Sequence, residues 1–436
     1  MARQRRDLET LWREIEQAGS IQAYIDAQVV ERGFVVNVKP TDEMSKREYG
    51  EYKKQLKAEA AERKALKKEA WQAYRSKHIV SLGEGVFWND FTDFDKWDLE
   101  DAENRAAENE LLPIDSPSQL AERLSLSISQ LRWLAFHRDA ATSLNYQRFT
   151  IPKRDGTERP IWAPLPLLKQ TQRWILRNIA ERLLVHGAAH GFLAGRSIAT
   201  NAAVHGDSKT ILKMDLKNFF PTVTLPRVKG IFRKAGYREQ VATLLALICT
   251  EAPREIIKRN GKTYYVSLGP RCLPQGAPTS PALTNTICLK LDGRLDGLAK
   301  KYGWRYTRYA DDLTFSLPNS HAGPPKLGAL CGLVKKTVSA EGFKINAEKT
   351  RVVRSGSRQK VTGLVVNGDR GPRTTRKIRR ELRAAINNLK NGKPLKEGET
   401  IESLLGMAAF VSMTQREVGR KLMDQISAAA GAGVSA

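Results

Sequence analysis

The strongest constraint in this sequence is a pair of adjacent carboxylates, Asp311-Asp312, between two runs of alternating side chains. A period of two residues predicts two β-strands, here joined as a hairpin. Its turn would ordinarily carry Asn-Gly, and adjacent like charges repel each other there. Hard divalent cations take oxygen ligands, so the pair indicates a metal site. The alternating positions are Trp304, Tyr306, Arg308, Leu313, Phe315 and Leu317.

A third carboxylate belongs to another predicted strand. Ile211 and Met214 lie in an apolar run that ends near Asp215, just before Phe219 and Phe220. A carboxylate at the end of a buried strand is costly unless it is paired or bound to a metal. We therefore expect Asp215 to lie beside the Asp311-Asp312 turn.

Charge is distributed unevenly along the 436 residues, whose formal net charge is +25. Residues 1–150 hold 23 basic and 26 acidic side chains, whereas residues 151–436 hold 49 and 21. A strongly cationic surface favours a polyanionic partner, and nucleic acid is the common one. A merely solubilising surface is the alternative.

Several classes of protein are excluded by composition. No apolar run approaches the roughly 20 residues of a membrane span, and we expect no signal peptide because the first segment is charged. The four cysteines contain no CxxC pair, which argues against zinc and disulfides. A reducing cytoplasm is the simplest location.

Further motifs follow in order along the chain. Helices are predicted over 7–32 and 45–77, and a basic hairpin over 149–164. A Gly/Pro-bounded loop at 273–285 contains Pro-Gln-Gly and leads into a helix, where backbone N–H groups readily face a ligand. A helix over 372–390 is rich in arginine, which suits contact with a phosphate backbone, and a last helix is predicted over 400–428.

This ordered set of motifs resembles the reverse transcriptases. The resemblance implies an α+β right-hand polymerase with fingers, a palm built on an antiparallel sheet with packed helices, and a helical thumb. It implies fingers over 116–210, a palm over 211–360 with finger insertions, and a thumb with a basic C-terminal region over 361–436. A helical N-terminal extension with an acidic and aromatic linker, residues 1–115, would precede them.

Within that family the chain is most similar to the bacterial retron enzymes, and its long extension resembles the myxobacterial type. Two local signatures carry this similarity: Asn-Ala-x-x-His at 201–205 and Val-Thr-Gly at 361–363. The similarity makes Asn201 and His205 candidates either for reading the cognate RNA or for supporting the fold around it; a lone histidine is otherwise more often a packed residue. The candidate RNA-binding residues are Asn201, His205, Val361, Thr362, Gly363, Arg376 and Arg380.

The resemblance also implies roles in the reaction. Asp215, Asp311 and Asp312 would hold two Mg²⁺ ions, for which Mn²⁺ is a possible substitute, with Asp312 the less direct ligand. Basic side chains would bind the incoming dNTP, and a bulky residue would exclude the ribose 2′-hydroxyl. The nucleotide-binding candidates are Lys153, Arg159, Phe220, Gln275 and Gly276, and Lys349 is either a proton donor to pyrophosphate or an ordinary surface lysine.

The implied activity is RNA-directed DNA synthesis on a cognate structured non-coding RNA. An internal guanosine 2′-hydroxyl would prime it and leave a branched single-stranded DNA joined to RNA, with a host ribonuclease H removing template. The family further implies anti-phage defence with a separate effector protein. Two alternatives remain: a group II intron-like or other defence-associated enzyme using conventional primers, and an RNA-binding scaffold with a vestigial polymerase site.

Overall fold

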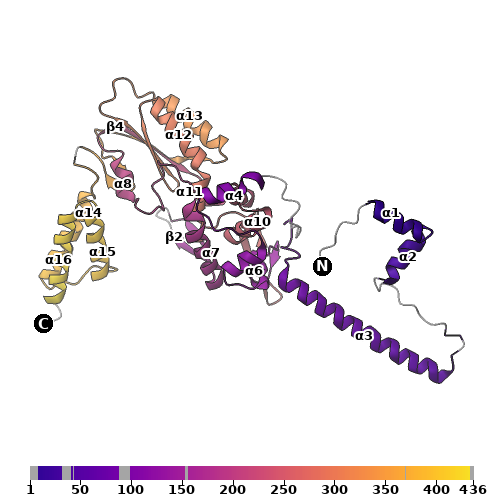
Figure 1. The fold of residues 1–436 in the computed structure, drawn as a ribbon. Coiled ribbons are helices and arrows are strands. Elements are labelled where there is room, and N and C mark those ends of the chain that lie inside the picture. The colour runs from indigo at the N-terminus through magenta and orange to yellow at the C-terminus, as the bar shows by residue number, and fades with distance from the viewer. Residues whose placement is uncertain are drawn as a thin grey trace. The chain divides into compact units, whose positions relative to one another are not determined.

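The computed structural model describes residues 8–31, 41–42, 44–87, 99–152, 156–368 and 370–432 (Figure 1). The chain divides into two compact units, Met1–Tyr74 and Arg75–Ala436. Each unit is described by itself. Among the described residues, no helix has the length and apolar character that crossing a membrane requires.

The first unit is helical. The single helix expected over 7–32 is two helices, α1 (Leu8–Gln17) and α2 (Ile21–Glu31), because the chain turns at Gly19 with a positive φ of 82°. The Tyr24 hydroxyl donates to the Glu14 carboxylate at 2.9 Å and links the two. The long helix α3 (Lys46–Lys77) lies where expected, and none of its side chains is buried.

Part of the predicted N-terminal extension belongs to the second unit. Ile79, Leu82, Leu111 and Ile114 are buried in the main hydrophobic core, so the boundary expected at residue 115 does not coincide with the edge of the compact unit. Most of the acidic and aromatic linker, residues 88–98, lies outside the described part of the chain. The helices of this region are α4 (Leu99–Glu108), α5 (Pro117–Arg123) and α6 (Ile128–Ala135).

Local signals account for the start of this helical layer. The Ser116 side chain accepts from the Gln119 backbone N–H, and Pro117 occupies the first turn of α5, where its missing N–H costs nothing. Ser127 forms a capping box with Gln130 at the start of α6. The basic hairpin follows as β2 (Tyr146–Pro152) and β3 (Glu158–Pro164), and then α7 (Pro166–Asn178).

The centre of the second unit is a four-stranded antiparallel sheet in the order β7-β8-β4-β9. Its strands are β4 (Ser208–Leu216), β7 (Arg305–Tyr309), β8 (Asp312–Pro318) and β9 (Ile345–Arg354). Both faces of β7 and β8 are covered. Tyr306 and Arg308 point to α12 (Leu289–Lys301), while Thr307 points to the segment that follows α8 (Ile198–Ala203).

A second, smaller sheet pairs β1 (Ala140–Ala141) with β6 (Lys262–Ser267) and β6 with β5 (Arg254–Arg259). Asn260-Gly261 forms the turn between β5 and β6 with both φ angles positive, as this dipeptide predicts. The helices beside these sheets are α9 (Leu225–Lys234), α10 (Glu239–Cys249), α11 (Ser280–Ile287) and α13 (Leu327–Ala340).

The C-terminal region has a core of its own. A short hairpin, β10 (Lys360–Val361) and β11 (Leu364–Val365), precedes three helices. These are α14 (Arg376–Lys390), α15 (Ile401–Ser412) and α16 (Arg416–Ala432), so the last predicted helix, 400–428, is in fact two. Leu382, Leu404, Val411 and Ile426 are buried between them.

Candidate active site

Three aspartates lie at one end of the central sheet. Tyr309 pairs with Asp312 across the β7-β8 hairpin, so Ala310 and Asp311 form its turn. Asp312 in turn lies opposite Asp215 in β4, and the Leu216 N–H donates to the Asp311 carbonyl at 2.9 Å. The proximity of Asp215 to the Asp311-Asp312 turn is therefore what the sequence predicts.

The three carboxylates affect one another. Burial, and then the negative charge of Asp215, raises the pKa of Asp311 to about 6. Burial also raises the pKa of Asp312, and Asp215 adds to the effect. From the neighbouring strand β9, Asn346 donates to one oxygen of Asp215 at 3.3 Å and Lys349 donates to the other at 3.1 Å. Carboxylates that are close together and partly buried ionise less readily than free ones. A bound cation would offset their negative charge, so cation binding at this site is favoured.

The donor set fits a divalent ion that shares its ligands with a substrate. Among the described residues, no three acidic, histidine or cysteine side chains form a ready-made metal cage. Mg²⁺ seldom needs one, because it keeps several waters and takes further oxygens from substrate phosphates. Two or three carboxylates at the rim of a sheet are consistent with that mode of binding.

A buried ion pair lies beneath the turn. Arg308 and Asp292 are both fully buried, and the Arg308 guanidinium donates to both carboxylate oxygens of Asp292 at 2.7 to 3.1 Å. Tyr306 donates its hydroxyl to the same carboxylate at 2.8 Å. Arg308 also donates to the Ala310 carbonyl at 3.2 Å and to the Asn285 side-chain oxygen at 3.0 Å. The guanidinium thus connects α11 and α12 to the turn that carries Asp311.

The same network extends to a loop before α8. Asn285 donates its amide to the Gly191 carbonyl at 2.8 Å. A Cβ on Gly191 would lie 2.8 Å from the Ala310 nitrogen, so only glycine allows this approach to the turn. Arg308, Asp292 and Asn285 were not predicted as site residues. The available signal was Arg308 itself, a cation at an alternating position otherwise occupied by Trp304 and Tyr306, which requires a buried partner.

The Pro-Gln-Gly loop contacts the basic hairpin. The Gln275 carbonyl accepts from the Trp162 N–H of β3 at 2.8 Å. Gly276 has a φ of 122°, and a Cβ there would lie 2.6 Å from the Trp162 carbonyl oxygen. The loop and the strand that carries Arg159 are therefore joined. Lys153 lies outside the described residues.

Phe220 begins a short 3₁₀ turn, Phe220–Thr222, that follows β4. Its ring lies 5.5 Å from that of Phe219, centroid to centroid, and it is only half-buried, whereas Phe219 is in the core. Phe220 lies five residues beyond Asp215, and its partial exposure leaves it available to a ligand, but its contact with Phe219 also suits a packing role.

The two sequence motifs, Asn-Ala-x-x-His at 201–205 and Val-Thr-Gly at 361–363, contact each other in the structure. Asn201 and Val361 are buried, and the Asn201 amide donates to the Thr362 hydroxyl at 3.4 Å. Thr362 donates to the Ile198 carbonyl at 3.1 Å. Thr362 and Gly363 both have positive φ and form the two-residue turn between β10 and β11, a geometry that glycine permits.

The predicted RNA-binding residues His205, Asn201 and Val361 are all buried. His205 is fully buried, with Nδ1 2.8 Å from the Ser316 hydroxyl and Nε2 2.7 Å from the Thr307 hydroxyl. Burial lowers its pKa to about 3, so it is neutral at physiological pH. Of the two alternatives, the structure favours the one in which these side chains support the fold. Thr362 is half-buried and Gly363 exposed, so only this turn reaches the surface.

The helix α14 presents cations on one side. Arg376, Arg380 and Arg383 are exposed and follow one another at four- and three-residue spacing, which aligns them along one face. Leu382 and Ile386 on the other side are buried in the C-terminal core.

Comparison with known proteins identifies the class. Residues 151–378 match the family "Reverse transcriptase (RNA-dependent DNA polymerase)". The chain is 49% identical to the retron Mx162 reverse transcriptase of Myxococcus xanthus, across 95% of this chain and 87% of that protein. It is 42% identical to the retron Mx65 enzyme of the same organism, across 70% and 69%, and 33% identical to the retron Ec86 enzyme of Escherichia coli, across 71% and 87%.

The chain therefore belongs to the reverse transcriptase family, and within it to the retron reverse transcriptases of myxobacterial type. It is an RNA-directed DNA polymerase. The α+β fold expected from the sequence is confirmed.

Replacing Asp292 by Asn should leave the Arg308 charge buried without a counter-ion. Loss of one partner of a buried ion pair costs about 3–5 kcal/mol. The free energy of unfolding, measured with urea, should therefore decrease by that amount. Asp296→Asn is the matched control, one turn along α12, because its pair with the exposed Lys300 contributes about 1 kcal/mol or less. Equal effects of the two substitutions would contradict the role of the buried pair.

Replacing His205 by Ala should destabilise the fold without weakening RNA binding by the folded fraction. The Ser316 and Thr307 hydroxyls each lose a buried partner, at about 1–3 kcal/mol per unsatisfied group. Chemical denaturation measures the first effect, and RNA titration of protein verified as folded by circular dichroism measures the second. Normal stability with weakened RNA binding would instead indicate a direct contact.

Proposed function

We propose that this polymerase copies part of a cognate structured non-coding RNA into branched, multicopy single-stranded DNA. Synthesis begins on the 2′-hydroxyl of an internal guanosine, and the product remains joined to RNA. The similarity to the retron Mx162 enzyme over nearly the full length of both proteins is the observation that carries this proposal. The intact cluster of Asp215, Asp311 and Asp312 supports catalysis rather than a purely structural role.

In the proposed reaction Asp215, Asp311 and Asp312 hold two Mg²⁺ ions, or Mn²⁺ in their place. When bound, such ions activate the attacking hydroxyl and stabilise the leaving pyrophosphate. Lys349 pairs with Asp215 at 3.1 Å and, in this proposal, donates a proton to the leaving pyrophosphate. Its hydrogen bond to Asp215 and the carboxylate charges outweigh the effect of burial and raise its pKa, so it is protonated at neutral pH.

The substrate side of the proposal rests on the hairpin and the loop that contacts it. Lys153 and Arg159 bind the incoming triphosphate, which Arg can hold through two parallel hydrogen bonds. Gln275 and Gly276 line the nucleotide and template side. Phe220 excludes a ribose 2′-hydroxyl and thereby selects dNTPs.

RNA contacts are assigned to exposed groups. The Thr362-Gly363 turn and the arginines of α14, Arg376 and Arg380, bind the RNA. Three buried residues support the surrounding fold: Asn201 contacts that turn, Val361 lies just before it in β10, and His205 contacts β7 and β8. We further propose the fingers, palm and thumb limits given above, action in the cytoplasm, template removal by a host ribonuclease H, and anti-phage defence through a separate effector protein.

Expression of the protein with the RNA encoded beside its gene tests the proposal. Wild-type protein should yield a DNA whose mobility shifts after treatment with a debranching enzyme. Asp311→Asn should reduce that DNA at least a hundredfold, because the carboxylate charge is lost from the site where the ions bind. Asp424→Asn, an exposed aspartate of α16, is the control and should have no effect.

Synthesis that needs a conventional primer and is unaffected by deletion of the RNA gene would overturn the priming mechanism and favour a group II intron-like enzyme. Absence of any Mg²⁺-dependent extension by the wild type, on this RNA or on a primed template, would favour a scaffold with a vestigial site.

The arginine face of α14 should determine part of the salt dependence of RNA binding. Each phosphate contact that is lost lowers the slope of log K against log salt by about 1. Arg376→Ala with Arg380→Ala should therefore lower the slope by about 2 in filter binding from 50 to 300 mM KCl. Arg123→Ala, an exposed arginine of α5, serves as control, and an unchanged slope in the double variant would show that this face does not contact RNA.

A further inference from the structure

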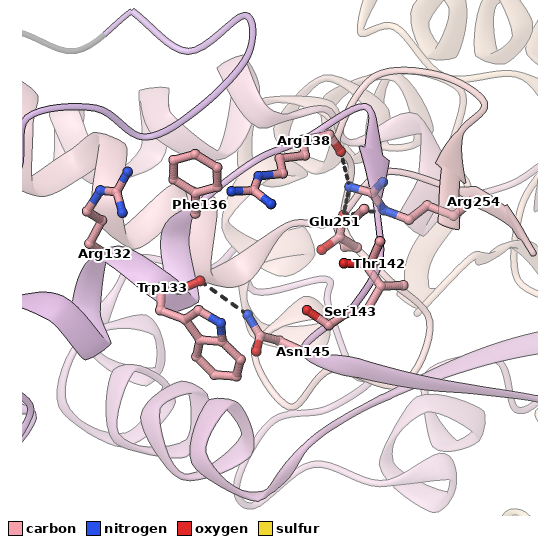
Figure 2. A pocket seen from close by; sticks show the side chains of 11 residues that line it. Arg132, Trp133, Phe136, Arg138, Thr142, Ser143, Asn145, Glu251 and Arg254 are labelled. Atoms are coloured by element: carbon pink, nitrogen blue, oxygen red, sulfur yellow. Dashed lines mark hydrogen bonds and ion pairs between the residues drawn. The ribbon is translucent and has the colours of Figure 1, made fainter. Parts of the chain in front are cut away.

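A cavity of about 310 Å³ lies between α6, the segment that follows it, and the start of β5 (Figure 2). Its volume is at the lower end of the range for small-molecule pockets, roughly 300–1,000 Å³. None of the residues that we assign to catalysis or dNTP binding lines it. The lining residues used below are Arg132, Trp133, Phe136, Arg138, Asn145 and Arg254.

Two arginines stack on one aromatic ring in this cavity. The Arg132 guanidinium lies 4.6 Å from the centroid of the Phe136 ring, and that of Arg138 lies 5.0 Å from it. Burial, and then the positive charges of Arg75 and Arg138, lowers the pKa of Arg132. Arg132 donates to the Ser81 carbonyl at 2.9 Å. The described residues place no carboxylate in a salt bridge with Arg132 or Arg138, so the positive charge here is concentrated and suits an anion.

The cavity also offers an aromatic surface and an unused hydrogen-bond acceptor. Trp133 lies in α6 and is 49% exposed, although the next two residues of the same helix, Leu134 and Ala135, are buried. The Asn145 amide nitrogen donates to the Trp133 carbonyl at 3.4 Å. The Asn145 side-chain oxygen is buried but has no hydrogen-bond partner among the described residues. A buried acceptor without a partner is costly unless a ligand or a water satisfies it.

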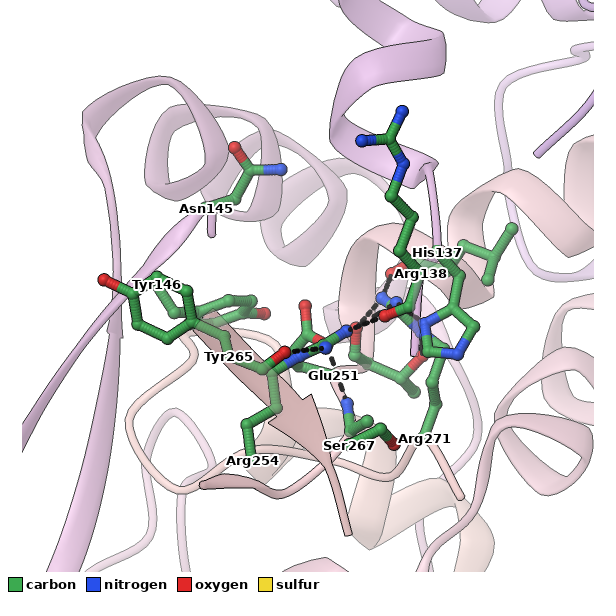
Figure 3. A network of polar contacts seen from close by, with 12 residues as sticks. His137, Arg138, Asn145, Tyr146, Glu251, Arg254, Tyr265, Ser267 and Arg271 are labelled. Atoms are coloured by element: carbon green, nitrogen blue, oxygen red, sulfur yellow. Dashed lines mark hydrogen bonds and ion pairs between the residues drawn. The ribbon is translucent and has the colours of Figure 1, made fainter. Parts of the chain in front are cut away.

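A network of polar contacts forms the floor of the cavity (Figure 3). Arg254 donates to Glu251 at 3.1 Å and to the backbone carbonyls of Arg138 and Tyr265 at 2.8 and 3.0 Å. Arg271 approaches the same Glu251 oxygen at 3.6 Å. Glu251 is thereby neutralised and cannot serve as a counter-ion for the arginines above. The segment that carries Arg138 is fixed before any ligand arrives.

We propose that this cavity binds one nucleotide of a single-stranded stretch of RNA, outside the polymerase site. Its phosphate contacts Arg132 and Arg138, its base stacks on Trp133, and a base N–H donates to the Asn145 side-chain oxygen. Splayed bases held by aromatic stacking and by Arg are the usual mode of single-stranded RNA recognition. An acidic peptide would also suit the arginines, but it has no flat ring for Trp133. The inference rests on the proposed function only in taking RNA as the polyanion.

Binding of a fluorescein-labelled decauridylate, followed by anisotropy, tests this site in the full-length protein. Stacking on an aromatic side chain contributes enough that Trp133→Ala should weaken binding at least fivefold, whereas Trp133→Phe should stay within about twofold of wild type. Arg138→Ala should weaken binding and lower the salt slope by about 1, whereas Arg123→Ala should do neither. Extension of oligo(dT) on poly(rA) with Mg²⁺ should remain within twofold in every variant.

Three results would overturn the assignment. One is unchanged affinity in Trp133→Ala, and another is equal weakening by Arg138→Ala and Arg123→Ala, which would indicate diffuse charge. The third is that Arg138→Ala keeps the wild-type affinity for RNA but no longer binds a labelled Glu-Asp decapeptide. That result would assign the cavity to an acidic protein. Failure of the wild type to make branched DNA would contradict the proposed priming mechanism but would leave these RNA affinities measurable.

Discussion

The ion pair between Arg308 and Asp292 is the interaction on which the candidate active site depends. A guanidinium and a carboxylate without solvent contact are strongly destabilising unless each finds its full set of partners. Here every partner is a part of the site's framework: Tyr306 on the same strand, Asn285 on α11, and the Ala310 carbonyl at the turn. The pair therefore determines where the hairpin turn lies relative to the helices that cover the sheet.

The fixed position of the hairpin turn has a chemical consequence. Asp215, Asp311 and Asp312 repel one another when ionised, and burial adds to the cost. A flexible turn would relieve the repulsion by moving Asp311 away. The Arg308 contact to Ala310, the N–H of Leu216 on the Asp311 carbonyl and the close approach of Gly191 all oppose that movement. The free energy released when a cation binds is then available to hold substrate rather than to assemble the site.

The sequence predicted the parts of the site whose chemistry is local, and it missed those that depend on packing. Alternation located the hairpin, and the cost of a buried carboxylate identified Asp215. The order of motifs identified the family. Asp292 was not found because it lies in a helix whose pattern looks ordinary; only the three-dimensional fold pairs it with Arg308. The sequence left two roles open for His205 for the same reason, since a motif cannot show that both ring nitrogens contact buried hydroxyls. Helix breaks at Gly19 and at 413–415 were missed because the apolar spacing continues across them.

Two cationic regions of the second unit differ in how their arginines are held, and we propose different functions for them. The arginines of α14 are exposed on a regular helix, which suits contact with phosphates irrespective of sequence. Arg132 and Arg138 are instead held on Phe136, above a floor in which Arg254 and Arg271 already neutralise Glu251. Ordering two like charges in this way is costly in the free protein, and an anion bound there would relieve that cost. Trp133 lies beside this position, as does the Asn145 oxygen, which has no partner within the described part of the chain, so such an anion is better supplied by a nucleotide than by a phosphate backbone alone. The proposed copying of one particular RNA would need a contact of this second kind, because phosphate contacts position a nucleic acid but do not distinguish it from others.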